Sequence, residues 1–167
     1  MTIDPILAAP LLVQVHIAAA VPALLLGPVA LFRRRRDRLH RIVGRAWVIA
    51  ILALALTGLI LPGRFAVVGP FGPIHLFAPL AIWGVVDGVR LIRRGDVAGH
   101  RRAMRSVWFG AVGVASLVTL LPGRTLNRAL FGEATEVAWI VIALGLVALV
   151  ALWRRSLRGG SGGQITS

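Results

Sequence analysis

The sequence contains no cysteine and no lysine, and only six of its 167 residues are acidic. Without cysteine the chain cannot form disulfides, bind metals through thiolates or use thiol nucleophiles. No arrangement of nucleophile, base and acid typical of a hydrolase is present either. All 19 basic residues are therefore arginines, and the formal net charge is +13 at pH 7.

Hydrophobic residues, in contrast, make up 57% of the chain. Five apolar stretches each approach the ~20 residues that a helix needs to cross ~30 Å of hydrocarbon. They are residues 5–32, 43–61, 73–92, 104–121 and 135–153. No alternating strands of a membrane barrel are visible, and helices satisfy their own backbone polar groups in lipid. The sequence therefore predicts an all-α polytopic membrane protein with about five transmembrane helices.

The arginines concentrate beside alternate spans. Seven lie between residues 33 and 45, six between 90 and 105 and three in the tail, which leaves three elsewhere. The positive-inside rule then predicts a bacterial cytoplasmic (inner) membrane protein with the N-terminus outside and a flexible cytoplasmic tail at 154–167. Because these arginines flank spans, we expect contacts with the lipid bilayer and anionic lipids, and no nucleic-acid binding.

The tetrapeptide LPGR occurs twice, and the two copies are 60 residues apart (121 − 61). The same offset relates the segment HRIVGRAWV at His40 to HRRAMRSVW at His100, and His16 maps onto His75 at an offset of 59. These matches predict two copies of a helical hairpin, with the copies related by a pseudo-two-fold axis along the membrane normal.

The predicted organisation is a single transmembrane domain over residues 1–153. Its repeat units cover about residues 8–64 and 67–124, and an extra helix covers 135–153. Within the LPGR segments, proline and glycine are expected to end the helix and turn the chain. Pro22, Pro28 and Pro79 are expected to kink their helices, and Asp87 to pair with a neighbouring arginine such as Arg90.

The repeat arranges the four histidines as two pairs. His16 and His75 lie roughly 25 Å from the arginine-rich edge, near the outer face, whereas His40 and His100 lie at the inner edge. An ionisable residue inside a span is a candidate functional residue. The alternative is a structural role: a hydrogen bond from His16 to a neighbouring helix, and solvated interfacial positions for His40 and His100.

Two opposed imidazoles without thiolates suit a planar macrocycle that already supplies four nitrogens. The pairs therefore predict bis-histidine haem b, one or two per chain, with copper(I) as the alternative metal. Arginines at both ends are candidates to bind haem carboxylates. They are Arg64 and Arg124 in the LPGR segments, and Arg41, Arg45, Arg101 and Arg105 at the inner edge.

The runs GPVALFRRRRDRLHRIVGRAWV, PIHLFAPLAIWGVVDGVRLIRRGDVAGHRRAMRSVWFG and LLPGR resemble an uncharacterised bacterial membrane family, domain of unknown function 2306, over about residues 10–125. The resemblance implies a membrane protein without an established activity. The histidine layout also resembles cytochrome b561-type proteins, in which four consecutive helices each give one histidine and alternate helices pair.

That second likeness implies an outer haem at His16 and His75 and an inner haem at His40 and His100. The implied function is transmembrane electron transfer, with a redox partner at either face. The alternative function is a non-redox accessory or assembly protein, or a small-solute or metal carrier, with structural histidines.

Overall fold

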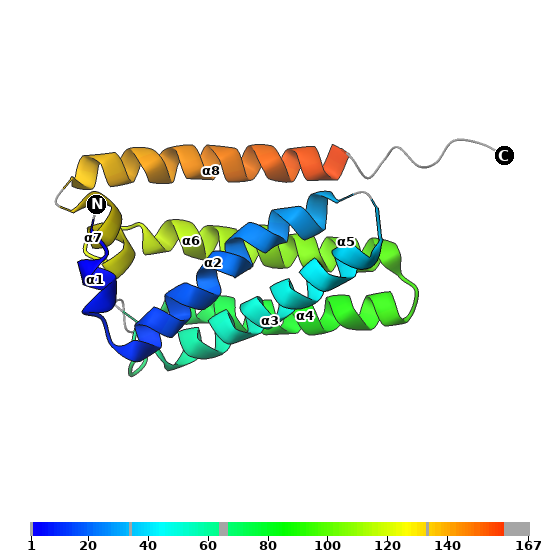
Figure 1. Ribbon diagram of the computed structural model, residues 1–167, viewed down its shortest axis with the longest axis horizontal. Helices are drawn as coiled ribbons and strands as arrows, with labels where there is room; N and C mark the ends of the chain where they lie inside the picture. The colour runs from blue at the N-terminus through cyan, green and yellow to red at the C-terminus, as the bar shows by residue number, and fades with distance from the viewer. Residues whose placement is uncertain (1, 34, 64–66, 133, 159–167) are drawn as a thin grey trace.

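The computed structural model describes residues 2–33, 35–63, 67–132 and 134–158, and these residues are predominantly helical (Figure 1). The elements in chain order are α1 (Asp4–Leu7), α2 (Leu11–Phe32), α3 (Arg38–Ile60), the 3₁₀ helix η1 (Pro73–Leu76), α4 (Phe77–Arg93), α5 (Val97–Ser106), the π-helix η2 (Val107–Gly113), α6 (Val114–Thr119), α7 (Thr125–Phe131) and α8 (Thr135–Arg158).

Four of the described helices are long and apolar enough to cross a membrane. They are Leu11–Phe32, Arg38–Ile60, Pro73–Arg93 and Glu136–Leu157. The predicted span at 104–121 falls in a run of α5, η2 and α6, which is divided by the π-helical segment. The all-α polytopic fold is therefore confirmed, while the count of five spans stays a prediction.

The structure differs from the prediction at two boundaries and in one additional short helix. The first apolar stretch breaks at Pro10, where Gln14 Nε2 bonds the carbonyls of Leu7 (3.1 Å) and Ala9 (2.9 Å) and joins α1 to α2. The predicted tail starts too early, because α8 continues through residue 158; the rest of the tail lies outside the described residues. The short helix α7, absent from the prediction, lies against α1, where the Thr2 N–H donates to the Ala129 carbonyl at 3.1 Å.

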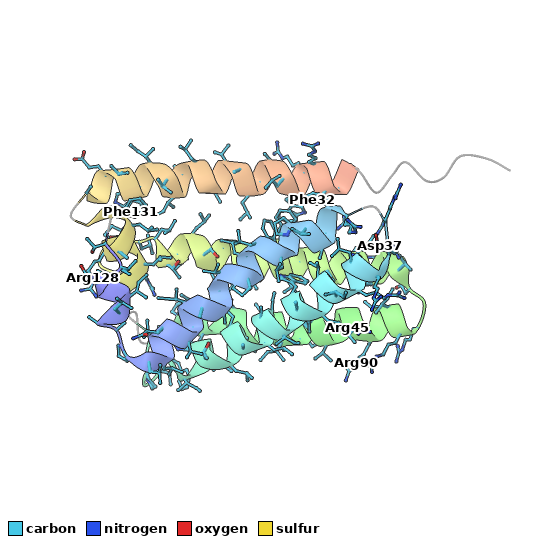
Figure 2. All side chains as sticks on the ribbon, in the orientation of Figure 1. Phe32, Asp37, Arg45, Arg90, Arg128 and Phe131 are labelled. Atoms are coloured by element: carbon cyan, nitrogen blue, oxygen red, sulfur yellow. The ribbon has the colours of Figure 1, made fainter. Side chains whose placement is uncertain are left out.

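Successive long helices run antiparallel, so the molecule has two distinct ends (Figure 1). We call the end with residues 33–37, residues 94–96 and the C-terminus of α8 the arginine-rich end. The LPGR end carries α1, α7 and the described parts of both LPGR segments. Figure 2 places Asp37 and Arg90 at the arginine-rich end, and Arg128 and Phe131 at the LPGR end. The arginine clusters that the sequence places beside alternate spans thus gather at one end of the bundle.

The core lies where α2, α3, α4, α5 and η2 meet. Small residues bring these helices close together, as in other membrane bundles. A Cβ atom on Gly27 would lie 2.0 Å from Trp108 Cδ1, and one on Gly84 would lie 2.5 Å from Val107 Cγ2. Any side chain larger than that of glycine at residue 27 would therefore overlap Trp108.

Two tryptophans donate to consecutive carbonyls of α2. Pro28 lacks an N–H, so the carbonyl of Leu24, four residues earlier, loses its helical donor. Trp108 Nε1 donates to this carbonyl at 3.1 Å, and Trp47 Nε1 donates to the Ala23 carbonyl at 2.8 Å. In hydrocarbon a backbone group without a partner is costly, and neighbouring helices commonly satisfy carbonyls freed by proline.

Candidate functional site: the histidine pairs

His16 is half-buried on α2 and binds a threonine of the neighbouring helix α3. Its Nδ1 lies 2.9 Å from Thr57 Oγ1. The Thr57 hydroxyl directs its proton to its own helix, 2.7 Å from the Ala53 carbonyl, so the hydroxyl oxygen accepts from the His16 Nδ1–H. This bond matches the structural alternative for His16 and leaves Nε2 as the unprotonated ring nitrogen.

His75 is buried, with 7% of its surface exposed, and uses both ring nitrogens. Nε2 donates to the Leu61 carbonyl at 2.8 Å, and Nδ1 accepts from the Gly72 N–H at 3.0 Å. The edge of the ring also meets Phe71, with ring centroids 5.1 Å apart. His75 thus joins the end of α3 to the loop before η1, and an iron ligand at this residue would have to displace a hydrogen bond.

The outer histidines occupy the LPGR end, and both contact the last turns of α3 or the residues that follow them. A Cβ atom on Gly58 would lie 3.2 Å from His16 Cε1, and one on Gly63 would lie 2.8 Å from His75 Cε1. Each ring is therefore held by α3 and its following loop through its own set of partners.

The two LPGR segments have different conformations. In the second, Pro122 and Gly123 occupy the centre of a type II turn: Gly123 has φ +81° and the Arg124 N–H donates to the Leu121 carbonyl at 3.3 Å. In the first, the Gly63 N–H donates to the Pro70 carbonyl at 2.8 Å.

The two arginines of these segments differ in what the structure describes. Arg64 lies outside the described residues. Arg124 lines a small apolar pocket of ≈ 230 Å³ together with Ile74, Phe77 and Val118.

His40 lies in the first turn of α3, next to an aspartate that caps the helix. Asp37 accepts from the His40 backbone N–H at 3.1 Å and is also paired with Arg33. Chiefly through its hydrogen bond, Arg33 holds the pKa of the Asp37 carboxyl well below its ordinary value. His40 Nδ1 is buried and has no hydrogen-bond partner among the described residues. The carbonyl of Ala30 also acts electrostatically on the ring.

His100 lies in the first turn of α5 and mirrors this local arrangement. Asp96 caps that helix by accepting from the Gly99 N–H at 2.7 Å. His100 Nδ1 donates to the Gly88 carbonyl of α4 at 2.8 Å, so Nε2 is the acceptor nitrogen of the neutral ring. The two inner rings are near enough that His100 acts electrostatically on His40. The assignment of His40 and His100 as a pair of ligands stays a prediction.

The four inner arginines surround this region without converging on it. Arg41, Arg45 and Arg101 are exposed. Arg105 donates through Nη1 to the Ser156 carbonyl of α8 at 2.7 Å and through Nε to the Arg101 carbonyl at 3.2 Å. Arg105 thus holds α8 against α5.

Within the described residues no group of three or more histidines, aspartates or glutamates is placed to hold a metal ion.

Asp87 is the residue that the sequence assigned wrongly. Among the described residues the one ion pair joins Arg33 to Asp37, and Asp87 forms none with Arg90. Asp87 instead lines a groove between α4 and the α5–η2 run. The signal was available in the sequence, because an acid inside an apolar span is a functional candidate by default.

The helices, their apolar surfaces and the two charged ends define a polytopic α-helical membrane protein. The model of a family described as "Predicted membrane protein (DUF2306)" matches residues 13–154, and the chain belongs to this family. The resemblance found in the sequence is thereby confirmed, whereas the cytochrome b561 likeness stays a prediction. No curated protein and no solved structure matches the chain.

Proposed function

We propose that this protein binds haem b between His40 and His100 at the arginine-rich end and transfers electrons at that face of the membrane. The observation that carries the proposal is the buried His40 Nδ1, which has no hydrogen-bond partner among the described residues and is within electrostatic range of His100. An unbonded buried ring nitrogen costs free energy, and a ligand bound there removes that cost.

The surroundings of both rings support a ligand role. His100 Nδ1 donates to the Gly88 carbonyl at 2.8 Å, and the Ala30 carbonyl acts electrostatically on the His40 ring. Such a bond fixes the tautomer and orientation of a metal-ligating histidine. Two nitrogen ligands without a third suit haem, whereas zinc requires four ligands. When bound, haem b would supply one-electron chemistry, and Arg41, Arg45 and Arg101 are exposed nearby for its carboxylates.

The outer pair supports a second haem less well. His75 has both ring nitrogens bonded, and His16 is held by Thr57. We therefore propose one haem per chain, with His16 and His75 in structural roles. The arginine distribution favours insertion in a bacterial inner membrane with the arginine-rich end in the cytoplasm. A redox partner would then act at the cytoplasmic face.

The same hydrogen bonds favour the second candidate function, a non-redox accessory protein or carrier in which every histidine is structural. Copper(I) held by His40 and His100 is the variant that still uses a metal, because two imidazoles suffice for it.

Absorption spectra of the purified protein, expressed with ample haem, separate these possibilities. We expect sharp bands on reduction with dithionite, lost in His40→Ala and in His100→Ala but retained in His16→Ala and His75→Asn. The last two variants are matched controls, since each removes an imidazole from the opposite end. A folded, colourless wild type rejects haem, and copper found by metal analysis then identifies the two-coordinate site. Haem bands that depend on His16 or His75 alone would move the site to the outer pair.

A further inference from the structure

A groove of ≈ 530 Å³ runs between α4 and the α5–η2 segment. Leu80 and Trp83 on one wall are 58% and 67% exposed, so the groove opens sideways, away from the core. Its wall on α4 extends from Phe77 to Leu91, which corresponds to about 21 Å along the helix. In a membrane this opening faces the acyl chains of the lipids, and its length suits one such chain.

The polar side chains of the groove gather in its arginine-rich half. They are Asp87 on α4, and Arg102 and Ser106 on α5; the rest of the lining is apolar or glycine. Asp87 and Arg102 carry opposite charges and line the same space, yet they do not pair in the described structure. One end of the groove therefore offers separate sites for a cation and an anion, and the rest of the groove is apolar.

We infer that this groove binds an amino-phospholipid with a primary ammonium headgroup, such as phosphatidylethanolamine. The ammonium group donates to the Asp87 carboxylate, the phosphate accepts from the Arg102 guanidinium, and one acyl chain lies along Leu80, Trp83 and Gly110. An ammonium offers three N–H donors to a carboxylate, and a guanidinium binds phosphate through paired N–H groups.

The orientation of the groove agrees with this occupant. Asp87 and Arg102 line the half of the groove toward the arginine-rich end, whereas the half that begins at Phe77 and Leu80 is apolar. A choline headgroup has no N–H to give Asp87, and a glycerol headgroup brings no cation. The proposed site is therefore selective among phospholipids, unlike the general attraction of arginine loops for anionic lipid.

Native mass spectrometry of the full chain tests the site. Purified protein in detergent is incubated with equal amounts of phosphatidylethanolamine, phosphatidylcholine and phosphatidylglycerol with identical acyl chains. We expect phosphatidylethanolamine to be retained about tenfold over phosphatidylcholine, because a charge-assisted hydrogen bond contributes a factor of that order. Asp87→Asn should abolish this preference, and Arg102→Gln should weaken the retention of all three lipids.

A second variant tests the groove without touching a charge. A Cβ atom on Gly110 meets nothing within 4 Å, so Gly110→Leu fills the groove without displacing the core and should reduce the retention of every lipid. Gly44→Leu is the matched control, because Gly44 lies on α3 and is equally open. Unchanged retention in Gly110→Leu overturns the proposal. A preference for phosphatidylethanolamine that survives Asp87→Asn overturns the assigned headgroup.

Discussion

The partners of a histidine decide which of its nitrogens can bind anything else. His75 donates from Nε2 to Leu61 and accepts at Nδ1 from Gly72, so both of its ring nitrogens are engaged. His100 donates only from Nδ1, and its Nε2 keeps a lone pair. At the level of single residues, His75 uses both ring nitrogens, whereas His16 and His100 each use Nδ1 and His40 Nδ1 has no partner among the described residues.

His75→Ala should lower the free energy of unfolding by about 1–3 kcal/mol, because it leaves the Leu61 carbonyl and the Gly72 N–H without partners. His75→Asn should recover part of this loss, since its side-chain oxygen can still accept from Gly72. Denaturant unfolding in detergent, followed by circular dichroism, measures both. Equal stability of the alanine variant and the wild type would contradict the structural role of His75.

The sequence identified all four histidines and their two pairs, but not the groups that each ring contacts. The offset of 60 aligned His40 with His100, and the neighbouring arginines made their site look interfacial. Their roles depend on carbonyls contributed by other helices, Ala30 and Gly88, which no local pattern shows. Likewise, the partner of His16, Thr57, is 41 residues away along the chain.

At the scale of whole elements, α2 depends on a hydrogen bond that another helix supplies. Trp108→Phe should destabilise the protein by about 1–2 kcal/mol, because the Leu24 carbonyl then has neither the indole nor a helical donor. Pro28→Ala restores an N–H at residue 28. The double variant should therefore lose less than the two single variants summed, with a coupling of about 0.5–1.5 kcal/mol.

Trp47→Phe provides the control for this cycle. Trp47 bonds Ala23, whose helical donor, the Gly27 N–H, is intact. We expect the effects of Trp47→Phe and Pro28→Ala to add. Additivity in the Trp108 cycle as well would show that the indole does not replace the donor that Pro28 lacks.

Hydropathy predicted the C-terminal ends of α2, α3 and α4 to within one residue, since a long apolar run in lipid has few alternatives to a helix. It could not predict η2, because the π-helical widening accompanies the burial of Trp108 and Phe109 against other helices. It also missed α7, whose seven residues include a buried asparagine: Asn127 Nδ2 donates to the Leu120 carbonyl at 2.7 Å. Short helices of this kind are defined by tertiary contacts.

At the scale of the whole molecule, the absence of cysteine makes the orientation directly measurable. Val67 is 75% exposed at the LPGR end, and Ala98 is exposed at the arginine-rich end. In intact cells a membrane-impermeant maleimide should label the Val67→Cys variant, and it should label Ala98→Cys only after permeabilisation. The opposite pattern would invert the proposed topology, and the cysteine-free wild type reports background labelling.

The bond between Trp108 and Leu24 also constrains how the protein is made. During synthesis the first three long helices are complete before residue 108 leaves the ribosome. Until then the Leu24 carbonyl, which Pro28 leaves without a helical donor, is exposed to lipid or translocon and lacks its bond from the Trp108 indole. The hairpin of α2 and α3 therefore lacks one hydrogen bond until the later half of the chain supplies it. A truncated chain that ends before Trp108 would keep this carbonyl unbonded in α2, and membrane proteases that act on exposed polar backbone could recognise it there.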